Sequence, residues 1–447
     1  MLKKLLESCT PAKILVLGFA GLILFGALLL TLPIAARNGQ STPFLTALFT
    51  ATSAVCVTGL VVVDTGTHYS LFGQLVILGL IQAGGLGIMT LTTLFALVFG
   101  KKINLRERLI IQEALNVLSL EGVVRLVKNI VIMTMVIEGL GAIVLSIRFA
   151  YDLGILKGIY YGFFHSISAF CNAGFDLFGP VYGPFSSLTH YVEDPVVSLT
   201  VPALIILGGL GFVVLGDVIR QRRFSRLSLH SKLAITLTAI LVAAGTTLIW
   251  LLESKNSLRH LSPLGSVLAA FFQAVTPRTA GYNTLNIGAL TQAAQFLIVI
   301  LMFIGASPGG TGGGIKTTTF GTLVLAAWSV VTGRADIEVF GRRLPKDAVL
   351  RSLAITLWAA ALVIVVTMCL TFTEKANFLT VLFETVSAFG TVGLSMGLTP
   401  HLSDIGRVLI ILTMFAGRVG PLTVMLAIWQ QRQLRNYHYP EEKIIVG

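Results

Sequence analysis

The stretch Gly305-Ala-Ser-Pro-Gly-Gly-Thr-Gly-Gly-Gly-Ile-Lys-Thr317 interrupts a long apolar run, in which Lys316 is the only charged residue between Arg278 and Arg334. Such a run is long enough to cross a bilayer, which takes about 20 helical residues. Its six glycines and one proline do not support a regular helix, because glycine is costly there and proline removes a hydrogen bond. Broken backbone at membrane depth persists only where it is buried in protein or lines a water-filled cavity. We therefore predict a loop that faces a pore.

The composition is that of a multi-pass membrane protein. Of the 447 residues, 55% are hydrophobic and only 12% are charged, and the mean hydropathy is +0.87. Soluble domains average about 25% charged residues. The 45 glycines suit closely packed membrane helices. The four cysteines are scattered without paired spacing, so neither a disulfide framework nor a zinc site is expected.

The net charge of +12 is concentrated between the apolar blocks. Basic residues cluster at 101–108, 220–226, 334–346 and 432–435. This spacing follows the positive-inside rule and predicts that both termini are cytoplasmic in a multi-pass protein of the cell membrane. The first apolar run, 14–36, is expected to be retained as a spanning helix. A basic face next to anionic lipid explains much of the charge, so no nucleic-acid partner is expected.

Four segments of the chain align without gaps. Each has phenylalanine ten residues before a glycine, and three have serine six residues and alanine five residues before it. The segments are Phe49-Thr-Ala-Thr-Ser-Ala-Val-Cys-Val-Thr-Gly59, Phe164-His-Ser-Ile-Ser-Ala-Phe-Cys-Asn-Ala-Gly174, Phe271-Phe-Gln-Ala-Val-Thr-Pro-Arg-Thr-Ala-Gly281 and Phe383-Glu-Thr-Val-Ser-Ala-Phe-Gly-Thr-Val-Gly393. A repeat of this kind indicates one structural unit used four times.

A second set of motifs follows the first. Gly84-Gly-Leu-Gly87, Gly208-Gly-Leu-Gly211, Gly305-Ala-Ser-Pro308 and Gly417-Arg-Val-Gly420 each lie in the next apolar block. One unit is therefore a spanning helix, a short segment that ends in glycine, and a second spanning helix. The first short segment, 44–55, would cover roughly 18 Å of a roughly 30 Å hydrocarbon core. It is predicted to be re-entrant.

We predict an all-α polytopic membrane protein. Four parallel helix–pore-loop–helix repeats surround one pseudo-fourfold pore, with eight spanning helices and four re-entrant half-helices. The predicted units are 1–100 with Gly59, 101–232 with a cytoplasmic linker and Gly174, 233–334 with Gly281 and the loop 305–317, and 335–447 with Gly393 and a cytoplasmic tail. Only the third inner helix is expected to be broken, because the other three carry merely Gly-Gly-Leu-Gly or Gly-Arg-Val-Gly at that level.

The repeated glycine has a chemical reason. A dehydrated monovalent cation at membrane depth needs replacement oxygens, which rings of backbone carbonyls supply. Glycine lets the backbone aim those carbonyls at an axis at low cost. The C-terminal ends of the half-helices carry partial negative charge, which favours a cation there.

The segments also resemble a known family. Val57-Thr-Gly-Leu60, Ala173-Gly-Phe175, Ala280-Gly-Tyr282 and Thr391-Val-Gly-Leu394 are similar to degenerate potassium-channel filters. Together with the broken third inner helix, they make the chain resemble the superfamily of K+ transporters that includes TrkH, KtrB and plant HKT proteins. Its length is most similar to that of the KtrB type.

The resemblance implies K+ uptake in a bacterial cell membrane, often stimulated by Na+. It also implies a homodimer with one pore per protomer, seated on a cytoplasmic ring of KtrA-like RCK subunits. ATP/ADP or NAD(H) is expected on that ring, with no cofactor in this chain. Glycine in all four repeats favours K+ over Na+, since family members with serine in the first repeat tend toward Na+.

The resemblance also assigns residues. The filter, which would hold K+ through backbone carbonyls, would comprise Val57, Thr58, Gly59, Leu60, Asn172, Ala173, Gly174, Phe175, Thr279, Ala280, Gly281, Tyr282, Thr391, Val392, Gly393 and Leu394. Separately from the resemblance, the broken helix and the mid-span arginine lead us to predict a gate that comprises Gly305, Ala306, Ser307, Pro308, Gly309, Gly310, Thr311, Gly312, Gly313, Gly314, Lys316 and Arg418.

The gate residues have other interpretations. A phosphate-binding loop is disfavoured, because Ile315 separates Gly314 from Lys316 and no strand precedes the loop. A break that only lets helices pack tightly stays open. Arg418 lies mid-span, where a buried arginine usually faces the bundle interior or water. It either contacts the carbonyls of the glycine-rich loop and forms an electrostatic barrier, or pairs with a neighbouring group in a purely structural role.

Several other charged residues are weaker candidates. Glu138 and Glu384 would either bind a cation or hydrogen-bond a neighbouring helix, and the second role is favoured. Asp64 and Asp176 follow filter glycines and would concentrate cations at the outer mouth. Arg278 is expected to tether the filter backbone.

No arrangement of residues suggests catalysis, so an enzyme is not expected. A secondary transporter of another small solute remains an alternative, although four parallel units disfavour it. A Na+-permeable member of the same superfamily and a structural or sensory subunit are the others.

Overall fold

The computed structural model describes residues 11–87, 90, 123–334 and 336–420. The predictions for the first ten residues, for the basic linker at 101–122 and for the tail from 421 fall outside these ranges. Within them the secondary structure is helical apart from a short antiparallel hairpin of β1 (Glu338–Val339) and β2 (Arg342–Arg343) and two isolated bridges. The predicted helical class is confirmed.

Four times along the chain, a long apolar helix is followed by a short helix. The pairs are α2 (Pro11–Thr31) with α3 (Phe44–Val55), α8 (Val123–Leu153) with α9 (Ile155–Phe170), α13 (Leu229–Glu253) with α14 (Pro263–Val275), and α17 (Lys346–Thr373) with α18 (Phe378–Gly390). The two members of each pair pack against each other. The bounds of α3 are those that the sequence predicts for the first short segment.

An inner helix follows each pair. The inner helices are α5 (Leu71–Leu86), α11 (Pro195–Leu210) with α12 (Phe212–Gln221), α15 (Gln292–Phe303) with α16 (Thr317–Val331), and α19 (Asp404–Val419). The connections contain α4 (Thr65–His68), α10 (Gly179–Tyr182) and the single turns η1 (Pro33–Ala35), η2 (Thr189–Tyr191), η3 (Phe224–Arg226), η4 (Ile287–Ala289) and η5 (Thr399–His401).

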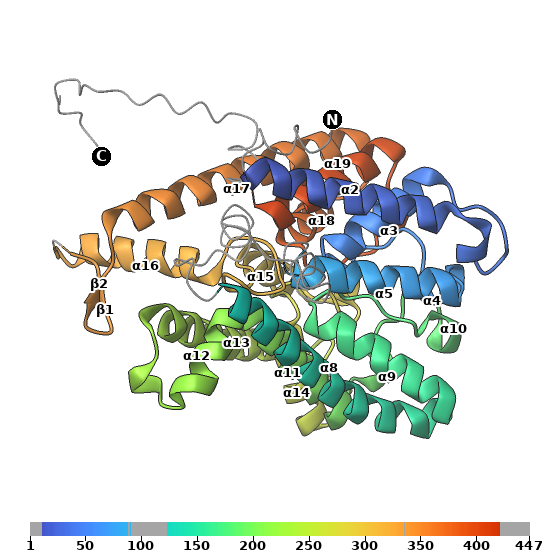
Figure 1. Cartoon of the computed structure of the whole chain (residues 1–447), viewed down its shortest axis with the longest axis horizontal. Coiled ribbons are helices and arrows are strands. Elements are labelled where there is room, and N and C mark those ends of the chain that lie inside the picture. The colour runs from blue at the N-terminus through green and yellow to red at the C-terminus, as the bar shows by residue number, and fades with distance from the viewer. Residues whose placement is uncertain (1–10, 88–89, 91–122, 335, 421–447) are drawn as a thin grey trace.

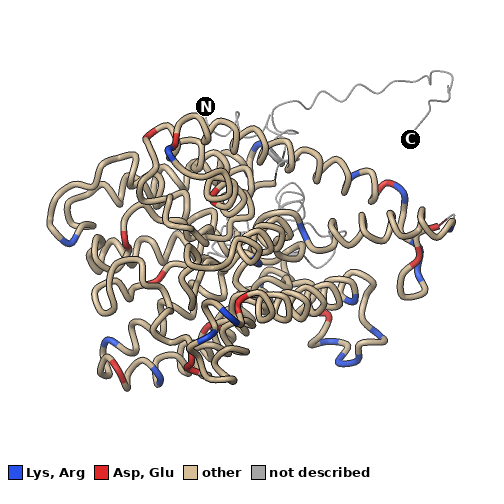
Figure 2. Tube along the Cα trace, turned by 180° about the vertical axis from the view of Figure 1, so that it is seen from behind, with Lys and Arg blue, Asp and Glu red and all other residues tan. Residues whose placement is uncertain are grey.

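The inner helices close the units into a ring. Each packs against the short helix of the next unit: α5 on α9, α11 on α14, α15 on α18, and α19 back on α3. In Figure 1, α2, α5, α16 and α17 run roughly along the long axis, with α4 and α10 at one end and α12 and the hairpin at the other. Figure 2 shows that the central part of the bundle carries few charged residues.

The described helices only partly account for eight spans. Four of them, in α2, α8, α13 and α17, are long and apolar enough to cross a membrane, and the bent pair α11–α12 makes a fifth. The helices α5, α15 and α16 are apolar but shorter. The chain is therefore a helical, multi-pass membrane protein, and the full count of eight spans stays a prediction.

The second inner helix is broken, contrary to the expectation that only the third would be. Between α11 and α12 the axis turns by 96° at Gly211, whose φ is +94°. The amides of Ser307 and Thr311 donate to the last carbonyls of α11, those of Gly209 and Gly208, at 2.8 and 3.1 Å. Helix ends leave such carbonyls unpaired. The third unit's loop satisfies them, so α11 ends where that loop packs.

Polar residues at the helix starts explain where many helices begin. Ser70, Ser228, Ser262, Thr291 and Ser403 each accept a hydrogen bond from the backbone amide three residues later. A capping side chain of this kind satisfies one of the free amides in the first turn. The apolar segments that follow therefore start as helices at defined positions.

The short helices form the centre of the molecule. Three of the four repeated phenylalanines, Phe49, Phe164 and Phe383, are fully buried, and Phe271 is partly buried beside Phe272, which is fully buried. A phenylalanine ten residues before each glycine thus anchors the helix whose end carries that glycine.

Candidate functional site

The four repeated segments share an unusual backbone conformation. The repeated glycines have φ between +66° and +93°. The residues two positions earlier also have positive φ, and they are Val57 (56°), Asn172 (59°), Thr279 (75°) and Thr391 (50°). Non-glycine residues rarely adopt this region, and such strain is often associated with function. This alternation of left-handed residues is shared by all four segments.

The four glycines form a closed ring. A Cβ built on Gly59 would lie 3.2 Å from the Cα of Gly174, and one on Gly174 would lie 2.9 Å from the Cα of Gly281. One on Gly281 would lie 3.2 Å from the Cα of Gly393, and one on Gly393 would lie 3.0 Å from that of Gly59. Each glycine therefore abuts the next in chain order. Any side chain at these positions would enter the backbone of the neighbouring segment.

Buried hydroxyls hold the four segments in place. Ser53 and Ser387 accept hydrogen bonds from the amides of Gly59 and Gly393, at 3.0 and 3.1 Å. Ser168 accepts from the amide of Phe175 at 3.0 Å. In the third unit Thr276 lies one residue later and donates to the carbonyl of Tyr282 at 2.5 Å. The serine six residues before the glycine was visible in the sequence, but its role as a buttress was not assigned.

Other polar contacts tie the segments to each other and to the loops beyond them. The hydroxyl of Tyr282 donates to the carbonyl of Phe175 in the preceding unit, at 2.8 Å. Glu384, fully buried in α18, accepts from the hydroxyls of Ser395 and Thr399 at 2.5 and 2.6 Å. The favoured role of Glu384, hydrogen bonding, is thus the one observed, although its partners lie in the loop after the fourth glycine rather than on a neighbouring helix.

The short helices end next to the ring. In the last turns of α3, α9, α14 and α18 no basic residue is present. The partial negative charge of four helix C-termini is therefore not neutralised by side chains of those turns. An ion of positive charge is favoured at this place.

A cavity of about 840 Å³ opens on one side of the ring and is lined by all four glycines. Asp64 and Asp176 also line it. Asp64 is buried and accepts from the amides of Thr67 and Phe185, at 2.8 and 2.9 Å. Asp176 lies in the loop after Gly174, outside the spanning helices, and burial together with the nearby Asp64 carboxylate raises its pKa to about 7. The cavity is thus an acidic vestibule.

The loop 305–317 lies on the opposite side of the ring and is largely buried. A parallel β-bridge between Ile304 and Ile315 joins the two ends of the loop. The amide of Gly313 donates to the hydroxyl of Thr391 at 3.0 Å, and the hydroxyl of Thr311 donates to the carbonyl of Phe170 at 3.2 Å. The loop therefore contacts the fourth segment directly and the end of the second short helix.

Glycine is required in this loop because it packs closely under the ring. A Cβ on Gly312 would lie 2.8 Å from the Cβ of Thr279, and one on Gly314 would lie 3.2 Å from the Cα of Gly390. Lys316 turns back on the loop and donates from Nζ to the carbonyl of Gly312 at 2.6 Å. Its ammonium group is thus bound by the loop's own backbone.

Arg418 joins this loop to the first unit. Its guanidinium donates to the carbonyl of Thr311 in the loop and to the carbonyl of Gly84 near the end of α5. A longer contact of 3.5 Å reaches the carbonyl of Gly85. Among the described residues, no ion pair of Arg418 with a carboxylate is present. The side chain therefore links two inner helices through backbone carbonyls.

The inner-helix motifs have a packing role as well. A Cβ at Gly84, Gly208 or Gly417 would collide with the carbonyl of Val55, Phe170 or Phe389, respectively, each at or next to the end of a short helix. The first glycine of three of the four motifs therefore lets an inner helix pass directly against that end.

Two other expectations concerned single residues. Within the described residues the side chain of Arg278 makes no hydrogen bond to the filter backbone: its guanidinium donates to the hydroxyl of Thr238 on α13 at 3.0 Å. Glu138 on α8 accepts from the side-chain amide of Gln82 on α5 at 3.1 Å, which is the favoured role of bonding a neighbouring helix.

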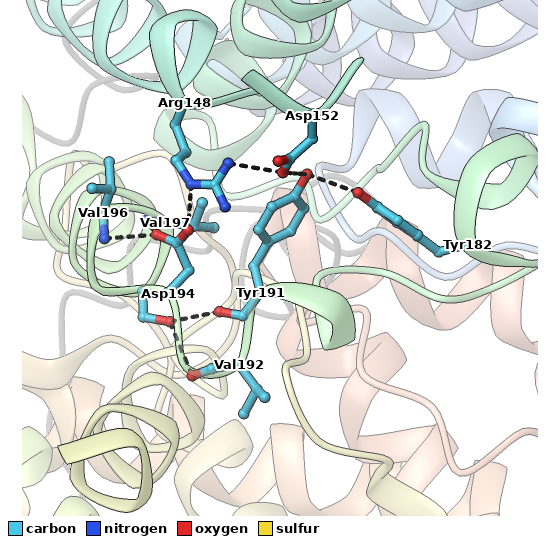
Figure 3. Close-up of polar contacts among 9 residues, drawn as sticks. Arg148, Asp152, Tyr182, Tyr191, Val192, Asp194, Val196 and Val197 are labelled. Atoms are coloured by element: carbon cyan, nitrogen blue, oxygen red, sulfur yellow. Dashed lines mark hydrogen bonds and ion pairs between the residues drawn. The ribbon is translucent and has the colours of Figure 1, made fainter. Parts of the chain in front are cut away.

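A charged cluster fixes the connection between α9 and α11 (Figure 3). Arg148 on α8 pairs with Asp152 at 2.8 Å and with Asp194, and its guanidinium carbon lies 5.3 Å from the centroid of the Tyr191 ring. Asp194 also caps α11 by accepting from Val197 at 3.0 Å. The start of the second inner helix is thus tied to α8.

Within the described residues, no group of three or more His, Cys, Asp or Glu side chains could hold a metal ion. The site therefore consists of backbone carbonyls, hydroxyls and two acidic side chains.

These features define a class: a helical membrane protein with a fourfold ring of backbone between an acidic vestibule and a buried loop. A family model described as TrkH, cation transport protein, matches residues 16–437. The chain is 44% identical to the Ktr system potassium uptake protein B of Bacillus subtilis (strain 168), over 98% of this chain and 97% of that protein. It is 42% identical to the potassium/sodium uptake protein NtpJ of Enterococcus hirae, over 100% of this chain and 99% of that protein.

A solved structure has the same fold. The crystal structure of the potassium transporter TrkH from Vibrio parahaemolyticus aligns with a TM-score of 0.71 and 18% identity, over 92% of this chain and 84% of that one. The chain therefore belongs to the TrkH family of cation transport proteins. As expected, this is a family of ion transport proteins and not of enzymes.

Proposed function

We propose that this chain is the ion-conducting subunit of a K+ uptake system. The observation that carries the proposal is the closed ring of four glycines, each preceded by a second left-handed residue. The relative from Bacillus subtilis, named a potassium uptake protein, is similar over nearly the full length of both chains. Conduction would be channel-like, through a filter of carbonyls.

In this proposal the filter residues act through their backbone. A K+ ion entering from the vestibule would exchange water for carbonyl oxygens of the four segments, as ions do in carbonyl-lined filters. The buried serines would keep those carbonyls at fixed spacing. The side chains of Leu60, Phe175, Tyr282 and Leu394 are buried, which is consistent with a role for their backbone rather than their side chains.

The loop 305–317 and Arg418 would form the gate. The loop lies directly under three of the four segments, the second, third and fourth, and Arg418 connects it to α5. The alternative role, a break that only permits tight packing, accounts for the glycines but gives no reason for an arginine bound to two carbonyls. Movement of the loop would have to release Arg418.

The orientation follows from charge. Two of the four basic clusters, 220–226 and 334–346, lie at the end of the molecule that carries α12 and the hairpin, so this side would be cytoplasmic and the vestibule external; the other two clusters fall outside the described residues. Eight spans, four re-entrant half-helices, the proposed unit boundaries and two cytoplasmic termini are consistent with this orientation. The ring packing of the inner helices supports the proposed arrangement of four units around one pore.

Partners are proposed from the relatives' names and the family resemblance. The name "Ktr system" indicates a system of components in which protein B is one. We infer a homodimer and a cytoplasmic ring of KtrA-like RCK subunits that bind ATP/ADP or NAD(H), with stimulation by Na+.

A Na+-permeable transporter is the second candidate. The Enterococcus hirae relative is named a potassium/sodium uptake protein and covers this whole chain. The four filter segments also differ in sequence from one another, and this difference favours a filter that is not strictly selective for K+ over Na+.

Growth rescue tests the proposal. The chain, expressed with its regulatory partner in a bacterial strain without K+ uptake, should restore growth at limiting K+. A Gly174→Val variant should not, because its Cβ would lie 2.9 Å from the Cα of Gly281. Gly183→Val, also at positive φ but with open space around it, is the matched control. Failure of the wild-type chain to restore growth, when normal amounts of it are in the membrane, would refute K+ uptake. Growth that instead depends on another small solute would favour a secondary transporter.

A further inference from the structure

The segment α12 lies across the direction of the helix that precedes it. It leaves α11 at 96°, so if α11 lies along the membrane normal, α12 runs roughly parallel to the membrane plane. Its last turns expose Val218 and Ile219, which are 39% and 62% exposed, next to the exposed Arg220. A helix with apolar and basic residues side by side is typical of the membrane interface.

Next to α12 is a pocket of about 300 Å³. It lies between the connection from α12 to α13 and the hairpin of β1 and β2. The charged groups that line it are Arg226, Lys232 and Arg342, and Ser225 and Gln221 add polar atoms. Its volume is at the low end for a ligand site and suits a headgroup rather than a whole lipid.

Among the described residues the pocket is positively charged, and none of the described residues that line it is acidic. The nearest carboxylate along the chain, Asp217, is engaged by the amide of Ser228 at 2.9 Å and the hydroxyl of Ser231 at 2.7 Å. Lys232 donates to the carbonyl of Ser225 at 2.8 Å, which leaves two further N–H donors. Figure 2 shows basic residues gathered along this connection.

An apolar rim borders the basic pocket. Phe224 and Phe340 are 48% and 44% exposed, and their rings meet edge to face with centroids 6.1 Å apart. Phe340 also lines the pocket. Exposed aromatic rings beside basic side chains at the end of spanning helices suit the boundary between headgroups and acyl chains.

We propose that this pocket binds the phosphate-bearing headgroup of an anionic phospholipid. Arg226, Lys232 and Arg342 would bind the phosphate, and the acyl chains would extend along Phe224, Phe340 and the exposed face of α12. The bound lipid would join the second inner helix to the hairpin between the third and fourth units. A lipid fits better than a free phosphate because the pocket is continuous with the apolar rim.

Lipid binding to the purified full chain in detergent tests the proposal. Native mass spectrometry would count bound dioctanoyl phosphatidylglycerol, with dioctanoyl phosphatidylcholine and inorganic phosphate as separate arms. The pocket variant is Arg226→Gln, Lys232→Gln, Arg342→Gln. The control variant, Arg334→Gln, Lys346→Gln, Arg351→Gln, removes the same charge from exposed positions outside the pocket.

Wild-type and control chains should bind phosphatidylglycerol at least tenfold more tightly than phosphatidylcholine. The pocket variant should lose affinity on the order of 100-fold, since each basic residue near anionic lipid contributes roughly a fivefold factor. Equal phosphatidylglycerol affinity in the pocket and control variants would overturn the proposal. Tight binding of inorganic phosphate alone would also overturn the proposal. A wild-type chain without preference for the anionic lipid would overturn it too, and would favour an acidic protein partner for the pocket. The readout is binding and does not depend on K+ transport.

Discussion

Replacing Arg418 with glutamine should release the loop 305–317. The guanidinium donates to the carbonyls of Thr311 and Gly84, which belong to two different inner helices. Glutamine has one neutral amide on a shorter side chain, so at least one of these bonds is lost. A hydrogen bond from a charged donor contributes about 1.5–3 kcal/mol. A shift of that size changes the ratio of displaced to seated loop by about tenfold to about 150-fold.

The assay is Rb+ uptake into proteoliposomes that contain the purified chain. Arg418→Gln should raise the uptake rate at least several-fold over wild type. Arg418→Lys keeps the charge but cannot bridge both carbonyls, so an intermediate rate would show that the bridge contributes beyond the charge. Arg407→Gln, on the same helix and 3.7 Å from Asp404, is the matched control and should leave the rate unchanged. A folded Arg418→Gln protein with wild-type uptake would refute the gating role.

Three further predictions concern other parts of the site. Burial and the nearby Asp64 raise the pKa of Asp176 to about 7, so its carboxylate is mostly neutral at pH 6 and mostly charged at pH 8. The apparent K+ affinity from the vestibule side should therefore rise between pH 6 and pH 8. Asp176→Asn should remove that rise. Gly312→Ala places a Cβ 2.8 Å from that of Thr279 and should displace the loop, with higher Rb+ uptake. Ser387→Ala leaves the fourth glycine's amide without its 3.1 Å partner and should lower the unfolding free energy by about 1–3 kcal/mol and weaken K+ preference.

Each of these predictions has a result that contradicts it. An Asp176→Asn chain that keeps the wild-type pH profile would exclude Asp176 as the titrating group. If Gly312→Ala abolishes uptake while Gly333→Ala, at positive φ in open space, does not, the loop is a structural support and not a gate. A Ser387→Ala chain with unchanged thermal unfolding and selectivity would show that the hydroxyl is no buttress.

Much of the fold could be predicted because its signal is local. The short helix at 44–55 was predicted from an apolar length too small to span, and α3 has those bounds. The repeated glycine and the earlier phenylalanine recur at fixed separation, so the units could be aligned without a structure. The order of the units around the ring was not predicted from that repeat and comes from the packing of each inner helix on the short helix of the next unit.

The break at Gly211 was not predicted. Its motif, Gly208-Gly-Leu-Gly211, is the same as that at 84–87, where α5 also ends at a glycine of positive φ, Gly87 at +83°. What ends α11 is a set of amides from the loop 305–317, a contact between residues about 100 positions apart. The side chain of Arg278 was misjudged for a similar reason, because its partner Thr238 lies on a separate helix. The role of Ser53 and its equivalents had a sequence signal, a serine at constant spacing, that was left without an interpretation.

We propose that the four repeated glycines form the K+ filter. The most direct test is the permeability ratio of K+ to Na+, measured from bi-ionic reversal potentials of the purified chain in planar bilayers. Serine at Gly59, Gly174, Gly281 or Gly393 should each lower the ratio by tenfold or more. Gly39→Ser, which shares the positive φ but has open space around it, should leave the ratio unchanged. Four conducting serine variants with the wild-type ratio would contradict the account.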